Sequence, residues 1–164
     1  MRKLLLVLLT GIALVTRVPA QTTMHTHNAD VIDGSKTPEL IPDVIAWRLW
    51  MLSVIAPDLD HPELAQHRQD VFLKKAGFDD TELDQARKVL AQFKQDYEAM
   101  KQAHNQQVQS GINPSLADFR VRRDSLAASA RDSLLSVTTQ GDEIKKYLTD
   151  EKAHMRIPVE EAQQ

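Results

Sequence analysis

The sequence contains no cysteine, and this absence excludes several kinds of chemistry. Without thiols the protein has no disulfide bonds, no thiolate nucleophile and no zinc site built on sulfur ligands. Its folded state must therefore be stabilised by packing.

Glycine is scarce as well, with five residues in a chain of 164. No glycine-rich phosphate loop occurs, and no serine lies in the Gly-x-Ser-x-Gly pattern of a hydrolase nucleophile. No segment alternates apolar and polar residues over the length of a strand, so a sheet protein is not expected. These absences favour a helical protein that is not an enzyme.

Only one long apolar run is present, at the start of the chain. It covers residues 4–15, after two basic residues and before the small residues Val18, Pro19 and Ala20. A membrane-spanning helix needs about 20 apolar residues, so this shorter run is typical of a secretory signal peptide. We predict a signal peptide cleaved after Ala20, a secreted or periplasmic location, and no stable membrane insertion of the mature chain.

The charge balance is mildly acidic, with 20 Lys and Arg, 23 Asp and Glu, and a formal net charge of −3. Three of the basic residues and none of the acidic ones lie in the predicted signal, so the remainder is more acidic still. An acidic domain is poorly suited to bind nucleic acid, and we expect no nucleic-acid partner. The single basic cluster, Phe119–Arg123, predicts a solvated, salt-bridged surface.

Turn and capping signals divide the rest of the chain into helices. Pro42 is a good first helical residue, Gly77 is typical of a helix end, and Ser115 with Asp118 forms a capping pair. A separate short turn is expected before Pro42, because Pro38 lies too close for one smooth helix. The expected helices cover residues 42–56, 60–77, 79–109, 115 to a break near 141, and 142–156.

The two longest segments carry apolar stripes at helical spacing. The stripe in residues 79–109 is spaced alternately three and four residues apart, as in a coiled coil. Its last member, His104, is expected to lie half exposed near the helix end. The predicted fold class is all-α, a small helical bundle built around a long antiparallel helical hairpin. The two stripes are Leu83, Ala86, Leu90, Phe93, Tyr97, Met100 and His104, and Leu116, Phe119, Leu126, Ala130, Leu134 and Val137.

The expected domain organisation follows from these segments. After the signal peptide, residues 21–36 are polar and contain the turn signal Asp33-Gly34, so they predict a flexible N-terminal arm. A single helical domain is expected over residues 37–157. Residues 158–164 begin with a helix-stopping proline and predict a frayed tail.

A partner-binding surface is predicted on the first helix. This segment is apolar nearly all round, and a small bundle is expected to leave part of it uncovered, with the long hairpin as the opposite wall. Aromatic side chains dominate binding hot spots, so we assign the surface to Trp47, Trp50 and Met51. Core filling is the other interpretation of the two tryptophans and the one that general burial preferences favour, because large aromatic side chains are mostly buried.

Metal binding is the second candidate activity. Met24, His25 and His27 lie within four residues and carry ligands that suit copper or zinc. Nothing else in the arm completes a set of four ligands, so no cofactor is predicted. Glu151 and His154 have the Glu-x-x-His spacing of dimetal bundles, but such sites use this motif twice, and a surface ion pair explains the single copy.

Two stretches support a resemblance to known proteins. The segments "DVIDGSKTPELIPDVIAWRLW" and "YLTDEKAHMRI" resemble secreted, all-helical bacterial proteins without an assigned activity. The export signal, the absent cysteines and the helical hairpin also resemble the Spy/CpxP group of periplasmic chaperones, distantly. Their hallmark is Leu-Thr-x-x-Gln, whereas here Leu148-Thr149 is followed by Lys152 at the fifth position. The resemblance implies a helical periplasmic protein that binds other proteins.

Together these observations predict an exported, non-enzymatic helical protein that binds proteins or peptides. An envelope-stress chaperone and an accessory subunit are the two roles considered, and a homodimer stays open. The alternative is a periplasmic metal-binding or metal-sensing protein that uses the His/Met arm.

Overall fold

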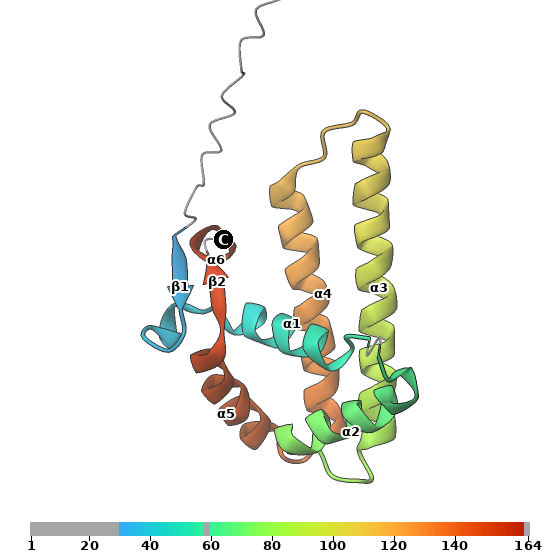
Figure 1. The fold of residues 1–164 in the computed structure, drawn as a ribbon, viewed down its shortest axis with the longest axis vertical. Coiled ribbons are helices and arrows are strands. Elements are labelled where there is room, and N and C mark those ends of the chain that lie inside the picture. Colours follow the sequence, from blue (N-terminus) through green and yellow to red (C-terminus); the bar gives the residue numbers. More distant parts are fainter. Residues whose placement is uncertain (1–29, 58–59, 163–164) are drawn as a thin grey trace, which may run out of the picture.

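The structure is a computed structural model that describes residues 30–57 and 60–162. The described chain is mostly helical, with two short strands that pair near its ends (Figure 1). Two long helices pack side by side as a hairpin, and the shorter helices gather around one end of it. The predicted all-α bundle around a long antiparallel hairpin is confirmed.

The hairpin consists of α3 (Leu83–Gln109) and α4 (Leu116–Val137). Before α3, the Asp79 carboxylate accepts a hydrogen bond from the Glu82 amide, and the Glu82 carboxylate accepts one from the Asp79 amide. At the start of α4, the Ser115 hydroxyl accepts a hydrogen bond from the Asp118 amide. The Asp79–Glu82 pair thus closes the turn that leads into α3, whereas Ser115 satisfies a backbone donor that the first turn of α4 leaves without a partner.

Burial along the α3 stripe falls from the base of the hairpin to its tip. Leu83, Ala86, Leu90 and Phe93 are buried, whereas the stripe residues from Tyr97 to His104 are half-buried. The distal turns of α3 and α4 extend beyond the other helices (Figure 1). The hydrophobic core therefore lies at the base of the hairpin.

Helix α1 (Asp43–Val54) is the central element of that core and packs against α2, α4 and α5. A 3₁₀ turn over Pro38–Leu40 precedes it, as the prolines predict. The buried residues of α1 lie all around the helix axis. The helix is apolar all round because other elements pack against it on all sides. The buried residues are Ile45, Ala46, Trp47, Arg48, Trp50, Met51 and Val54.

Helix α2 (Ala65–Ala76) follows a 3₁₀ turn at Pro62–Leu64 and ends where glycine predicts. Gly77 adopts a left-handed conformation with φ of 109°, which a residue without a Cβ reaches at no steric cost. The Phe78 amide then donates to the Leu73 carbonyl oxygen at 3.1 Å, and the Phe78 side chain is buried. This is the glycine stop with an apolar residue behind it.

The end of the chain differs from the sequence expectation of one helix over 142–156. Helix α5 (Gly141–Glu151) stops early, and a 3₁₀ turn (Lys152–His154) leads into strand β2 (Arg156–Pro158). Strand β1 (Val31–Asp33) pairs with β2 in antiparallel register, with Ile32 opposite Ile157. The short helix α6 (Val159–Ala162) follows.

These elements correct the expected arm and tail. Residues 31–33 of the predicted flexible arm form β1, and residues 158–162 of the predicted frayed tail lie in β2 and α6. The reason is a second apolar cluster that the two chain ends build with the start of α1. Its buried members are Ile32, Ile41, Ile45, Ala46 and Ile157. Among the described helices, none combines the length and hydropathy that a membrane span requires.

Candidate functional site

The three residues predicted to form a partner-binding surface are buried. Trp47 and Trp50 keep 4% and 3% of their surface exposed, and Met51 keeps none. The two indole rings pack edge to face with centroids 5.8 Å apart. Their large apolar side chains thus pack in the core. The prediction of an exposed apolar patch with these residues at its edge is wrong, because the three side chains have almost no surface available to a partner.

The predicted metal ligands Met24, His25 and His27 lie outside the described residues, so metal binding by the arm stays a prediction. Within residues 30–57 and 60–162, no group of three or more His, Asp or Glu side chains is arranged to hold a metal ion. Glu151 lies 3.8 Å from the Lys75 ammonium instead.

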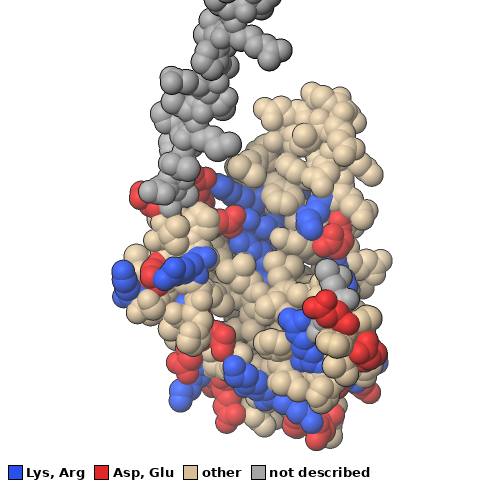
Figure 2. Space-filling model, in the orientation of Figure 1, with Lys and Arg blue, Asp and Glu red and all other residues tan. Residues whose placement is uncertain are grey.

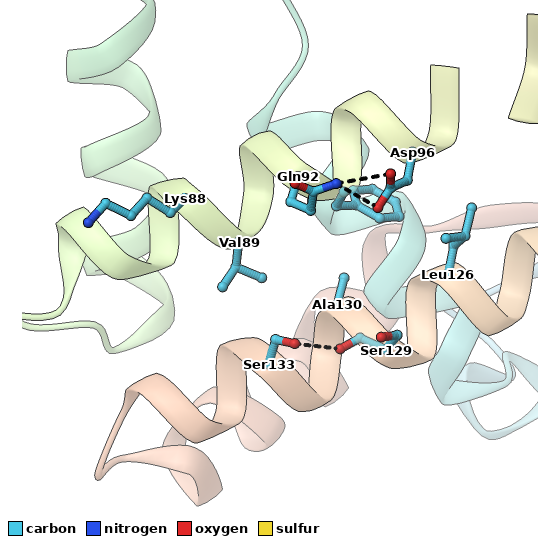
Figure 3. A pocket seen from close by; sticks show the side chains of 9 residues that line it. Lys88, Val89, Gln92, Asp96, Leu126, Ser129, Ala130 and Ser133 are labelled. Atoms are coloured by element: carbon cyan, nitrogen blue, oxygen red, sulfur yellow. Dashed lines mark hydrogen bonds between the residues drawn. The ribbon is translucent and has the colours of Figure 1, made fainter. Parts of the chain in front are cut away.

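An open groove lies between α3 and α4 and has a volume of about 300 Å³. Val89 of α3 faces Leu126 and Ala130 of α4 across it (Figure 3), and Phe93 of α3 also lines it. The groove forms because the side chains on α4 are mostly small where those on α3 are branched or aromatic. That volume is at the lower end of the range for ligand pockets, about 300–1,000 Å³.

Polar side chains form the rim of this groove. Lys88, Gln92 and Asp96 follow one another along α3, and the Gln92 amide donates to both carboxylate oxygens of Asp96 at 3.0 Å. On α4 the Ser133 hydroxyl donates to the backbone carbonyl of Ser129 at 3.0 Å. An apolar floor with a polar rim is suited to binding an amphipathic ligand.

A cluster of charged side chains lies on the other side of α4, between that helix, α1 and α6. Arg48, Arg123 and Asp124 are buried, with 4%, 6% and 6% of their surfaces exposed. Glu161 of α6 completes the cluster. The basic segment 119–123 was expected to form a solvated, salt-bridged surface. Arg123 is salt-bridged, but it is buried and not solvated, because paired carboxylates allow its burial.

Hydrogen bonds in this charged cluster set the pKa values of two members. Burial alone raises the pKa of Glu161, but hydrogen bonds from Arg123 and Arg48 outweigh burial and hold it below its usual value. Burial likewise lowers the pKa of Arg123, and the bonds to Asp124 and Glu161 more than offset it, so the net direction is upward. Glu161 and Arg123 are therefore both held in their ionised forms at neutral pH.

The tip of the hairpin carries no charged residue from position 102 to 117. Figure 2 shows this end as an uninterrupted uncharged surface. Val108, Ile112 and Leu116 are more than half exposed there. His104 is half-buried, as expected, and its ring packs 4.5 Å from that of Phe119.

Sequence reasoning placed the hairpin but missed both the groove and the charged cluster. The groove had a usable signal, the run of small residues "SLAASA" at 125–130 opposite the larger residues of α3. The charged cluster had none, because its members come from three separate elements.

Comparison with protein-family models, with curated proteins and with solved structures found no match. What the fold and the surfaces define is a class: a small helical bundle with an open groove along its central hairpin.

Proposed function

We propose that this protein is an exported, non-enzymatic helical protein that binds a segment of another protein in the groove between α3 and α4. The observation that carries the proposal is the groove itself, with Val89, Phe93, Leu126 and Ala130 on its inner face and polar groups at its rim. Recognition of a helix by an apolar groove is a common way of binding peptides.

The proposed occupant is an amphipathic helix about two turns long. Lys88 and Asp96 mark the ends of the rim on α3 and are eight residues apart, a distance of about 12 Å along a helix. Lys88 has no ion-pair partner within the described residues, and Asp96 is held only by the neutral amide of Gln92. A helix with apolar anchors, one acidic end and one basic end complements this rim.

Two roles fit such a site, a chaperone of the cell envelope and an accessory subunit of a larger assembly. The uncharged hairpin tip with its exposed Val108, Ile112 and Leu116 favours contact with incompletely folded proteins. Export follows from the predicted signal peptide over residues 1–20.

The test uses a designed helical peptide with leucine anchors, one glutamate end and one lysine end, labelled for fluorescence anisotropy. Ser129 lines the groove, and Ser129→Trp fills it, so we expect the affinity for this peptide to fall about tenfold or more, equal to 1.4 kcal/mol. Ser125→Trp is the matched control, because Ser125 is exposed on the same helix one turn away and does not line the groove. Equal binding by both variants and the parent contradicts the proposal.

A second arm of this test reads the rim charges. Lys88→Glu makes both ends of the rim acidic, so this variant is expected to prefer a peptide with lysine at both ends, whereas the parent prefers the peptide with one glutamate. The comparison does not depend on the direction in which the peptide binds. A peptide with one glutamate end and one lysine end can bind in either direction to match the parent rim, and a peptide with two lysine ends presents the same charges in both directions. If Lys88→Glu and the parent prefer the same peptide, the charges at the rim do not determine which peptide binds.

A further inference from the structure

The charged cluster between α1, α4 and α6 contains two buried arginines that need two anions. A buried guanidinium is strongly unfavourable unless it is paired and hydrogen-bonded. Asp124 is adjacent to Arg123 on α4 and neutralises one of the two positive charges. The second anion is Glu161, which belongs to the last described helix of the chain.

The carboxylate of Glu161 bridges the two guanidinium groups. Arg48 Nη2 donates to Glu161 Oε2 at 2.7 Å, and Arg123 Nη1 donates to Oε1 at 3.0 Å. On their other edges both arginines donate to Oδ1 of Asp124, Arg123 Nε at 3.0 Å. Asp124 thus fixes the two guanidinium groups, and Glu161 occupies the fork that they present.

Glu161 lies on the solvent side of this fork. Its side chain is 28% exposed, against 5% for Arg48 and 8% for Arg123. The planar fork of a guanidinium group matches the geometry of carboxylate and phosphate groups, and proteins often use arginine to bind them. The position of Glu161 is therefore that of a ligand, although it belongs to the same chain.

The helix that carries Glu161 is held by few contacts. Helix α6 has four residues, too few to be stable without tertiary support. Its Val159 amide donates to the Asp30 carbonyl oxygen at 2.7 Å, and Val159 and Ala162 are only partly buried against the smaller cluster. Glu160 reaches Arg120 at 3.6 Å with a largely exposed side chain. Local opening of α6 is thus expected to cost much less than unfolding of the bundle.

Basic side chains remain around the fork when α6 moves away. Arg120 precedes Arg123 by one turn on α4, and Figure 2 shows basic side chains gathered on α4 next to the acidic side chains of α6. Without Glu161 the cluster of Arg48, Arg123 and Asp124 carries a net positive charge. An anion that enters this site replaces every charge-assisted hydrogen bond that Glu161 gave up.

We propose that Arg48 and Arg123 form a binding site for an oxyanion, a carboxylate or phosphate group of a ligand, and that Glu161 is a built-in occupant which this ligand displaces. Ligand binding then releases α6 from the bundle. The proposal rests on the charged cluster alone and is independent of the groove between α3 and α4.

The experiment removes the occupant and supplies the anion from solution. Glu161→Ala leaves the fork empty, so we expect its melting temperature to lie below that of the parent. Sodium phosphate or sodium acetate should then raise it by several degrees more than sodium chloride of equal ionic strength. Titration calorimetry below the melting temperature should show phosphate binding to Glu161→Ala and at least tenfold weaker binding to the parent, where Glu161 competes.

Glu160→Ala is the matched control, because it removes an adjacent carboxylate that does not touch the fork. Phosphate or acetate should raise the melting temperature of this control no more than chloride does. A rise in the melting temperature of Glu161→Ala with both anions assigns the fork to oxyanions in general. A rise with acetate alone assigns it to carboxylates, and a rise with phosphate alone assigns it to phosphate groups.

Three results would overturn the proposal. They are an equal response of Glu161→Ala to chloride and to both oxyanions, an equal response of Glu160→Ala, and calorimetric binding that is as tight in the parent as in Glu161→Ala. If Glu161→Ala does not fold, Glu161→Gln keeps the size of the side chain while removing its charge, and the same comparison with chloride decides the question.

Discussion

Tyr147 of α5 lies where the apolar core meets the charged surface. Its ring is half-buried against the larger core cluster, and the Lys75 ammonium lies 5.9 Å from the ring centroid. Burial raises the pKa of Tyr147 to about 12, and the nearby carboxylate of Glu151 adds to the rise. Interaction with the Trp50 indole lowers the pKa of Tyr147, although the indole N–H makes no hydrogen bond of normal geometry.

We predict that Glu151→Gln lowers the pKa of Tyr147 but leaves it above 10.0, the ordinary tyrosine value, because burial is the larger cause. The measurement is a titration of tyrosinate absorbance in a Tyr97→Phe background, which leaves Tyr147 as the one tyrosine of the chain. Since the folded state disfavours the ionised form, stability should fall as the pH rises from 10 towards 12.

Asp150→Asn is the control for this titration, because it removes a negative charge from the same helix at an exposed position. It should leave the pKa of Tyr147 nearly unchanged. A fall as large as that caused by Glu151→Gln would mean that net charge, not the neighbouring carboxylate, sets the shift.

Single residues also show why part of the candidate site was predictable and part was not. Apolar character identifies Trp47 and Trp50 as either core or binding surface, and only the packing of the neighbouring helices decides between the two. Asp124 and Arg123 look like surface residues in the sequence, because their burial depends on Arg48 and Glu161, which lie far away along the chain.

Among the secondary-structure elements, the paired terminal strands depend on one glycine. The Gly34 amide donates to the Met155 carbonyl oxygen at 2.9 Å. A Cβ at Gly34 would lie 1.8 Å from the Lys152 carbonyl oxygen and 2.9 Å from that of Met155. The turn after β1 can therefore approach the segment before β2 only without a side chain.

We predict that Gly34→Ala separates β1 from β2 and lowers the free energy of unfolding by about 2 kcal/mol or more, since backbone atoms cannot yield to the clash. Chemical denaturation measures the loss, and hydrogen exchange at Ile32 and Ile157 locates it. Gly141→Ala is the matched control, with the nearest atom of Leu135 at an ordinary 3.6 Å. Unchanged protection of the two isoleucines in Gly34→Ala would show that the strand pairing does not need the glycine.

Local signals explain which elements the sequence predicts. The helix start at Ser115 and the stop at Gly77 are governed by residues within a few positions, and both are found where expected, whereas α3 begins at Leu83, after the turn that Asp79 and Glu82 close. The strands are three residues long and pair across the whole domain, so no periodic pattern reveals them. The same long-range contact explains why the last helix ends before residue 156.

At the scale of the whole molecule, the two ends of the described chain close on each other and on the bundle. Strand β1 pairs with β2, and α6 then places Glu161 against Arg48 of α1 and Arg123 of α4. Apolar packing supports the first contact, and charge supports the second. The closure should therefore respond to acid pH, whereas the apolar core at the base of the hairpin should not.

The sign of this pH response follows from the lowered pKa of Glu161. A carboxyl group whose pKa is lower in the folded state contributes stability above its unfolded pKa, and this contribution is lost as the pH falls below 4.5, the ordinary glutamate value. We predict that Glu161→Gln is less stable than the parent by about 1.5–3 kcal/mol at neutral pH, the range for hydrogen bonds to charged groups, with partial exposure favouring the lower part.

As the pH falls below 4.5, the difference between the parent and Glu161→Gln should shrink towards zero, because the protonated carboxyl of the parent then resembles the amide. Urea denaturation at a series of pH values measures the two free energies of unfolding. Glu160→Gln should show a small difference that hardly changes with pH, since its carboxylate is largely exposed and 3.6 Å from Arg120. A difference for Glu161→Gln that stays constant through this range would mean that shape, and not charge, holds the end of the chain in place.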